Sequence, residues 1–288
     1  MLVTLMAFSG IIEPSVNTLD HYKQRYRYSA ILLRQLVVTE FKLRYQGSAL
    51  GYVWTLLRPL FMFIILYLVF GVVFNAGANI PHYPVYLLLG ILLWNYFAEV
   101  TNNGVGAIVS KGDLLRKLNF PKYVIVLAGS ISAMINLLIN FTVLIIFMVI
   151  AGVDVHWHAL LFIPIVIELF VFSLGVAFLL SALFVRFRDV NYIWEIIMQA
   201  AFYLTPILYP ITLVIDRSHL AAQLLLLNPM AQIIQDARYV LITPETITFE
   251  GLFSIGWYRV IPIIITILLV IVSAFYFRRQ SPKFAEDI

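Results

Sequence analysis

The sequence predicts an all-α membrane protein with six transmembrane helices, and three observations lead to this prediction. First, 62% of the 288 residues are hydrophobic and only 12% are charged, against roughly 25% charged residues in soluble proteins. Second, several stretches without acidic or basic residues are long enough to cross a bilayer, which takes about 20 mainly apolar residues. Third, the basic residues gather in segments that six spans would leave on one side of the membrane.

The composition also excludes several classes of protein. A soluble fold would lack the polar residues needed to cover so much apolar surface, and a disordered chain would be far more polar. The chain has no cysteine, which excludes disulfides, thiol nucleophiles and cysteine-ligated metal sites. Most of the chain must therefore be solvated by lipid.

Six apolar segments have the length expected of transmembrane helices. The stretch from Pro59 to Ala98 has no charged residue and is about twice the needed length, so we divide it at Asn75–Pro81. Pro206 and Pro210 mark the end of the fifth segment. Lengths of this order suit helices, whose backbone groups are bonded internally, rather than barrel strands. The predicted spans cover residues 55–75, 84–104, 123–151, 159–185, 191–210 and 260–277.

The basic residues predict that both chain ends lie in the cytoplasm, because cytoplasmic loops carry an excess of lysine and arginine. Six spans would place only Arg217, Arg238 and Arg259 outside and the other 16 of the 19 basic residues inside. The predicted organisation is a cytoplasmic tail at 1–27, a membrane domain at 28–280 and a second tail at 281–288.

Residues 28–46 precede the first span and have the pattern of a helix lying along the cytoplasmic interface. Leu32, Leu36 and Leu43 share one helical face. Glu40 and Arg44 are four residues apart and able to pair. The alternative is a helix that only anchors the chain to lipid.

The loop between the second and third spans has the pattern of a short basic helix. Ser110 and Asp113 have the spacing of a capping box, and Arg116 and Lys117 follow near the expected helix end. Three leucines form an apolar patch, at Leu114, Leu115 and Leu118. We interpret this helix as a docking element for a cytoplasmic partner. The alternative is a solvated loop that only obeys the charge rule.

Between the fifth and sixth spans, residues 211–258 contain two apolar runs that are too short to cross the membrane, at 224–227 and 233–241. They predict re-entrant or interfacial helices that cap a pathway at the outer face. A plain outer hairpin packed on the spans is the alternative.

Acidic residues within apolar spans suggest function by default. Glu99 lies near three asparagines in the second span, while Glu168 and Glu195 lie in the fourth and fifth. They are candidates for a polar substrate path or a proton relay, or for carboxyls bonded to neighbouring helices. His156 and His158 lack further ligands, so we predict no metal site.

The segment from Arg44 to Pro59, RYQGSALGYVWTLLRP, closely resembles the sequence leading into the first span of ABC-2-type polysaccharide export permeases. These permeases export O-antigen, teichoic acids and related wall polysaccharides. Shorter motifs continue the resemblance from about residue 28 to 280: RKLNFP at 116–121, RFRD at 186–189, TPILYP at 205–210 and NP at 228–229. The segment GDLLRKLNFP at 112–121 is most similar to the corresponding segment of permeases for rhamnose-rich wall polysaccharides.

The resemblance implies a homodimer of six-span permeases that carries two copies of an ATP-binding subunit, in the inner or plasma membrane of a bacterium. ATP and Mg²⁺ would bind to that subunit, because this chain has no P-loop sequence. No cofactor is expected here. The implied substrate is a polysaccharide linked to a polyprenyl diphosphate, with membrane lipid around the chain and no nucleic acid partner.

Two sets of functional residues are predicted. Contacts to the ATP-binding subunit are assigned to Arg34, Arg44, Tyr45, Asp113, Leu114, Leu115, Arg116, Lys117, Leu118 and Phe120. The substrate path is assigned to Arg58, Phe61, Tyr67, Phe70, Glu99, Phe202, Tyr203 and Tyr209, because aromatic rings stack on the apolar faces of sugars and arginine attracts a diphosphate. The alternative is that these aromatic rings face lipid or core and that the arginines only set the topology.

Two other functions are compatible with the same residues. One is a membrane-embedded glycan or lipid transferase that uses Glu99 or Glu168 as its base. The other is a proton-driven transporter, which inverted repeats would favour. We find no such repeat and no ladder of acidic residues and histidines through the spans.

Overall fold

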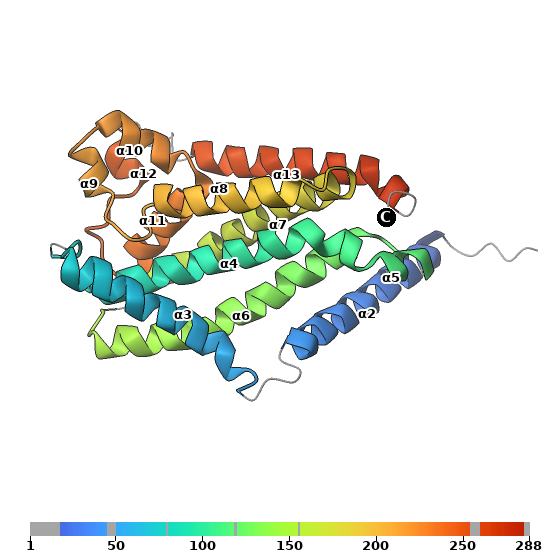
Figure 1. Cartoon of the computed structure of the whole chain (residues 1–288), viewed down its shortest axis with the longest axis horizontal. Coiled ribbons are helices and arrows are strands. Elements are labelled where there is room, and N and C mark those ends of the chain that lie inside the picture. The colour runs from blue at the N-terminus through green and yellow to red at the C-terminus, as the bar shows by residue number, and fades with distance from the viewer. Residues whose placement is uncertain are drawn as a thin grey trace, which may run out of the picture.

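The structure is a computed structural model that describes residues 18–44, 50–78, 80–117, 120–154, 156–253 and 260–284. Figure 1 shows a bundle of long helices with small helices at both ends. The long helices are α2 (Thr18–Arg44), α3 (Val53–Leu66) with the π-helix η1 (Tyr67–Val73), α4 (Tyr83–Ser110), α6 (Tyr123–Ile150), α7 (Phe162–Arg186), α8 (Val190–Leu204) and α13 (Val260–Gln280). The short ones are α5 (Gly112–Lys117), η2 (Trp157–Leu161), α9 (Thr212–Ile215), α10 (His219–Leu226), α11 (Pro229–Leu241), α12 (Phe249–Leu252) and η4 (Ser281–Lys283). No strand occurs in these ranges, and the all-α prediction is confirmed.

Among the residues that the structure describes, five helical segments are long and apolar enough to cross a membrane: Val53–Val73, Tyr83–Ser110, Tyr123–Ile150, Trp157–Arg186 and Val260–Lys283. The predicted fifth span is represented by α8, which has 15 residues. At about 1.5 Å per residue such a helix is roughly 22 Å long, short of a core about 30 Å thick. It ends at Leu204 because Thr205 is extended and precedes Pro206. The six-span count is therefore not confirmed.

The centre of the bundle is α4. In its apolar stretch of 18 residues, 78% of the residues are buried, against 6% for the span formed by α3 and η1. It packs against α6 on one side and α7 on the other, and α7 in turn packs against α13. The outer position of α3 leaves Phe63 as its one buried residue. Any site at the edge of α4 is thus bounded by a loosely held first span.

Close packing of α4 on α7 depends on Gly104. A Cβ built on this glycine would lie 2.7 Å from the Cβ and 2.9 Å from the Cα of Ala177. Small residues at such a crossing let two membrane helices approach closely. The backbone of α7 cannot yield as a flexible side chain would.

Gly104→Ala is therefore expected to destabilise the folded protein by about 1–3 kcal/mol, because α4 and α7 must move apart. Gly106→Ala is the matched control, since a Cβ there meets nothing within 4 Å and alanine is the better helix former. Thermal unfolding of the purified proteins in one detergent measures both. Equal melting temperatures for the two variants would contradict the close packing.

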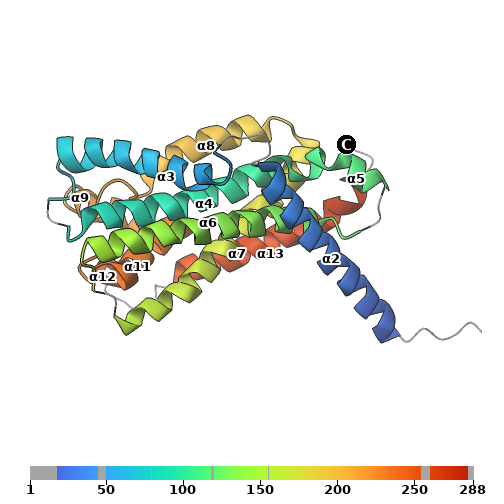
Figure 2. The ribbon, with the colours of Figure 1, turned by 90° about the horizontal axis from the view of Figure 1, so that it is seen from below.

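At one end of the molecule, α2 crosses the bundle at an angle and packs against α6 (Figure 2). The helix begins at Thr18, ten residues before the predicted start at 28. Its packed face includes Leu36, while Leu43 is 56% exposed, so the predicted leucine face is wrong at its last member. Glu40 accepts a hydrogen bond from the Ser132 hydroxyl of α6 at 3.4 Å.

Helix α5 and the C-terminal segment lie at this same end (Figures 1 and 2). The Lys122 amine donates to the Ser281 carbonyl and lies over the Phe284 ring, which fixes the C-terminal segment to the turn between α5 and α6. The predicted capping box is wrong: Ser110 is the last residue of α4, and its hydroxyl donates to the Ala107 carbonyl at 3.1 Å. The side of the membrane that this end faces stays a prediction.

The opposite end carries α9 to α12, in the region predicted to hold re-entrant or interfacial helices (Figure 1). Asn228 caps α11 by accepting from the Met230 amide at 3.0 Å, and Pro229 occupies its first turn. Residues 229–238 of α11 are all buried, and the helix packs against α4, α7 and α13. It is therefore inserted into the bundle rather than laid on its surface.

Candidate functional site

A cavity of about 780 Å³ lies between α3, α4 and α6. We call it the polar groove, because asparagines, one acid and one cation line it within an otherwise apolar bundle. Its polar residues are Thr55 and Arg58 of α3, Asn95, Tyr96, Glu99, Asn102 and Asn103 of α4, and Asn136 and Asn140 of α6. Polar groups from three separate spans thus come together. Because such groups are costly inside a membrane, they typically mark a functional path.

Glu99 and the two α6 asparagines form the floor of the polar groove. The Asn136 amide nitrogen donates to Glu99 Oε1 at 2.8 Å. The Asn140 amide nitrogen donates to the backbone carbonyl of Asn136, within α6, at 2.8 Å. Because the Asn136 bond ties α6 to α4, the carboxyl is held in place as a hydrogen-bond acceptor facing the groove. The bond to Asn136 matches the third alternative for Glu99, a carboxyl bonded to a neighbouring helix; its part in a substrate path stays a prediction.

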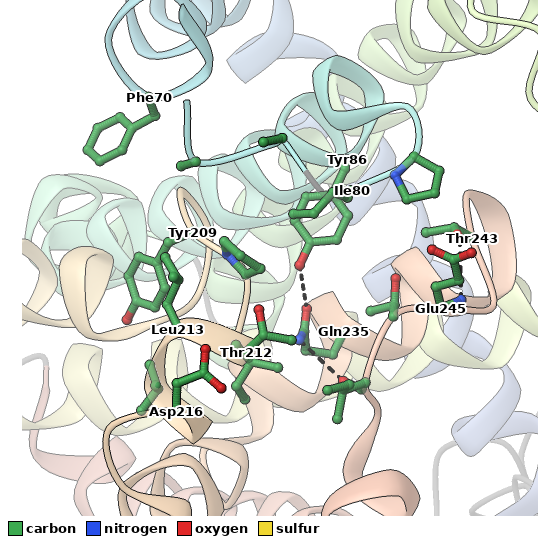
Figure 3. Close-up of a pocket in the computed structure, with 18 of the residues that line it drawn as sticks. Phe70, Ile80, Tyr86, Tyr209, Thr212, Leu213, Asp216, Gln235, Thr243 and Glu245 are labelled. Carbon is green, nitrogen blue, oxygen red and sulfur yellow. Dashed lines mark hydrogen bonds between the residues drawn. The ribbon is translucent and has the colours of Figure 1, made fainter. Parts of the chain in front are cut away.

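A second cavity, of about 830 Å³, lies at the end that carries α9 to α12. We call it the outer pocket, after the side of the membrane predicted for this end. Figure 3 shows its wall, formed by η1 and the following turn, by the segment after α8 and by the segment after α11. In this view the Tyr86 hydroxyl donates to Gln235 Oε1, at 3.3 Å. Asp216 and Glu245 are exposed at its edge, so the pocket is mainly apolar with an acidic rim.

Arg238, a fully buried arginine of α11, joins segments that lie next to the outer pocket. Its guanidinium donates to three backbone carbonyls: to Pro206 at 2.6 Å, to Ile207 at 2.7 Å and to Tyr86 at 3.1 Å. It also lies 3.6 Å from the centre of the Tyr86 ring. We call this set of contacts the arginine anchor. It joins the turn after α8 to α4 and α11.

The arginine anchor explains how α8 is able to end early at the edge of the bundle. Carbonyls freed at a helix end need donors when water is excluded. The Tyr209 hydroxyl donates to those of Tyr203 and Leu204, and the guanidinium donates to Pro206 and Ile207 in the turn that follows. Burial lowers the pKa of Arg238, while Tyr86 and Tyr83 raise it. Because a guanidinium keeps its proton in proteins, the anchor stays charged.

The predicted substrate-path residues do not form one surface. Arg58 and Glu99 line the polar groove, whereas Phe70 and Tyr209 line the outer pocket. The remaining four lie elsewhere. Tyr67 stacks on Phe63 with ring centres 5.8 Å apart, Phe202 packs on Trp94 at 5.7 Å, and Phe61 and Tyr203 are exposed on α3 and α8.

The predicted contacts to an ATP-binding subunit are divided between surface and core. Asp113, Arg116 and Lys117 are exposed on α5, and Arg34 is exposed on α2. Leu115 and Phe120 are buried in the core, and Leu114 packs partly against it. The two described leucines, Leu114 and Leu115, therefore face this chain, so α5 offers its charged residues outward. Tyr45, Leu118 and the Arg44 side chain lie outside the described residues.

Sequence reasoning missed two features of these sites. Asn136 and Asn140 lie in the charge-free third span, where their four-residue spacing on one helical face was an available signal. Arg238 was assigned only to the outer side. Its burial against carbonyls 31 and 32 residues away has no local signal. Within the part of the chain that the structure describes, no group of three His, Cys, Asp or Glu residues is placed to hold a metal ion.

Comparisons with known proteins agree with this architecture. The chain is 29% identical to an O-antigen export system permease protein RfbA of Myxococcus xanthus over 266 residues, 92% of this chain and 98% of the relative. It is 27% identical to an RfbA of Klebsiella pneumoniae over 92% of this chain and 98% of the relative. The polysialic acid transport protein KpsM of Escherichia coli is 22% identical over 72% of this chain and 80% of its own length. Residues 31–242 match the family described as ABC-2 type transporter, and the chain belongs to that family.

Proposed function

We propose that this chain is the membrane-spanning permease subunit of an ATP-driven exporter of a polysaccharide, in the inner or plasma membrane of a bacterium. The observation that carries the proposal is similarity over 92% of the chain to O-antigen export permeases. The apolar helices that form the bundle support it. So do the two cavities lined by residues of several spans.

Energy for transport comes, in this proposal, from a separate ATP-binding subunit that carries the ATP and Mg²⁺. This chain has no P-loop sequence. Two copies of the subunit would bind the end that carries α5 and α2. The exposed charges there, Asp113, Arg116, Lys117 and Arg34, give α5 and α2 polar surfaces suited to a soluble partner.

A second copy of this chain would complete the pathway. Helices α3 and α8 have one buried residue each, Phe63 and Met198, and otherwise expose apolar side chains. In a homodimer these two helices would shape a path for a polyprenyl-diphosphate-linked glycan. Arg58 is exposed on α3 and lines the polar groove. It would attract the diphosphate as the lipid-linked glycan enters the path.

Co-expression with a candidate ATP-binding subunit of the same host tests the assembly. The expected result is a complex that survives affinity purification in mild detergent, with two copies of each subunit by mass. As a control, an unrelated ATP-binding subunit should not be retained. The proposal would be overturned if this chain purified without the ATP-binding subunit and if cells that lack that subunit exported glycan normally.

A further inference from the structure

Two buried polar atoms in the polar groove have no hydrogen-bond partner within the protein. The Tyr96 hydroxyl and the Asn136 carbonyl oxygen Oδ1 are both unpaired, and their residues are only 2% and 4% exposed. Leaving such atoms unpaired costs stability. Both residues line the groove, so a ligand lying in it would supply the missing bonds once these side chains turn toward it.

The chemistry of the lining favours a neutral ligand that carries several hydroxyl groups. Asn136 Oδ1 accepts a hydrogen bond, and its amide nitrogen is already used by Glu99. The Tyr96 hydroxyl both donates and accepts. The asparagine amides of α4, at Asn95, Asn102 and Asn103, offer both donors and acceptors. Hydroxyl groups match such a mixed set, since each one donates and accepts.

Other ligand classes fit the polar groove less well. A divalent cation needs several carboxylate or carbonyl ligands, and Glu99 is the one acid in the lining. A phosphate group favours several cations or a row of amides, and Arg58 is the one cation. The volume of about 780 Å³ lies within the roughly 300–1,000 Å³ of small-molecule sites.

The apolar part of the lining suits the faces of a sugar ring. Trp54, Met62 and Ile65 of α3 and Leu92 of α4 lie around the polar residues. The Trp54 side chain is 45% exposed, so its ring is available as a stacking surface. An aromatic face with a polar end suits ligands that are apolar on one side and wet on the other.

We propose that the polar groove binds a short run of sugar residues of the transported glycan, with Tyr96 and Asn136 hydrogen-bonded to sugar hydroxyls. This inference rests on the proposed function. It places recognition of the sugar on α3, α4 and α6 of one subunit.

The test is glycan-stimulated ATP hydrolysis by the complex of this chain with its ATP-binding subunit in lipid nanodiscs. The probe is the lipid-linked glycan extracted from the host's own membranes, titrated against each variant. Tyr96→Phe removes one oxygen that has no partner in the protein. The expected result is a rise of about 5- to 10-fold in the half-stimulating concentration, with an unchanged or higher melting temperature. Asn136→Leu keeps the branching of the side chain but also removes the donor to Glu99, and it should raise the half-stimulating concentration further.

Ser173→Ala is the matched control, since the Ser173 hydroxyl is also buried and unpaired but lies outside the polar groove. It should leave the half-stimulating concentration unchanged. Polyprenyl diphosphate without sugar is the second probe, and the response of Tyr96→Phe to it should equal that of the unchanged protein. An unchanged glycan response in Tyr96→Phe overturns the sugar site while export stands. An equal rise in the half-stimulating concentration of polyprenyl diphosphate would assign the groove to the carrier lipid. That result also overturns the sugar site. No glycan stimulation of the unchanged complex overturns both the site and the proposed function.

Discussion

Arg238→Met is expected to destabilise the protein by about 3–5 kcal/mol and to abolish transport. The substitution keeps a long apolar stem but removes every donor of the guanidinium. The carbonyls of Pro206, Ile207 and Tyr86 are then left without this donor inside the bundle, at about 1–3 kcal/mol for each unsatisfied group. The turn that ends α8 would lose its attachment to α4 and α11.

Gly90→Ala tests the same anchor from a different helix and without changing any charge. A Cβ on Gly90 would lie 2.5 Å from Nη2 of Arg238. The guanidinium must therefore move away from the Ile207 carbonyl that Nη2 binds. We expect a smaller loss, of about 1–3 kcal/mol, typical of an overpacked site.

Melting of the purified transporter and glycan export by intact cells measure these effects. Arg217→Met is the control, because Arg217 is an exposed arginine in the same outer region and exposed substitutions change stability by about 0.5 kcal/mol or less. If Arg238→Met melted and exported like Arg217→Met, the arginine anchor would have no role.

Arg116→Glu combined with Lys117→Glu is expected to separate the permease from its ATP-binding subunit. Both side chains are exposed on α5, so the fold should be preserved. Reversing two charges at an interface replaces attraction by repulsion, which costs several kcal/mol. We therefore expect the affinity for the subunit to fall by about 100-fold or more, with ATP hydrolysis no longer responding to glycan.

Arg278→Glu combined with Arg279→Glu is the matched control for α5. These two exposed arginines end α13 at the same end of the molecule, and the charge change is identical. Binding measured by surface plasmon resonance in detergent separates the two cases. Equal losses in both double variants would indicate a nonspecific effect of net charge, and full binding by the α5 variant would remove α5 from the interface.

The leucines of α5 show where sequence reasoning reached its limit. Their spacing correctly predicted a short amphipathic helix, since α5 forms at Gly112–Lys117. Amphipathicity does not say which surface the apolar side meets. Leu115 is buried in the core of this chain, so replacing it with serine would test folding rather than docking. The exposed charges are the sharper probe.

Hydropathy predicted the bundle well and the two cavities poorly. Five predicted spans coincide with long helices because an apolar run of sufficient length leaves the backbone few alternatives in lipid. The predicted fifth span failed at its C-terminal end, where Pro206 breaks α8 and Arg238, distant in sequence, donates to the Pro206 carbonyl. Contacts such as Glu99 with Asn136 depend on which helices are neighbours, and the order of spans along the chain does not specify that.

ATP-driven transport by this chain is tested most directly by export of the lipid-linked glycan into sealed vesicles that contain this chain and its ATP-binding subunit in inverted orientation. We expect glycan to become protected from added glycosidase when ATP is present. Protection should be lost when the P-loop lysine of the ATP-binding subunit is replaced by alanine. Protection that needs no ATP, or that persists in the lysine variant, would contradict an ATP-driven permease.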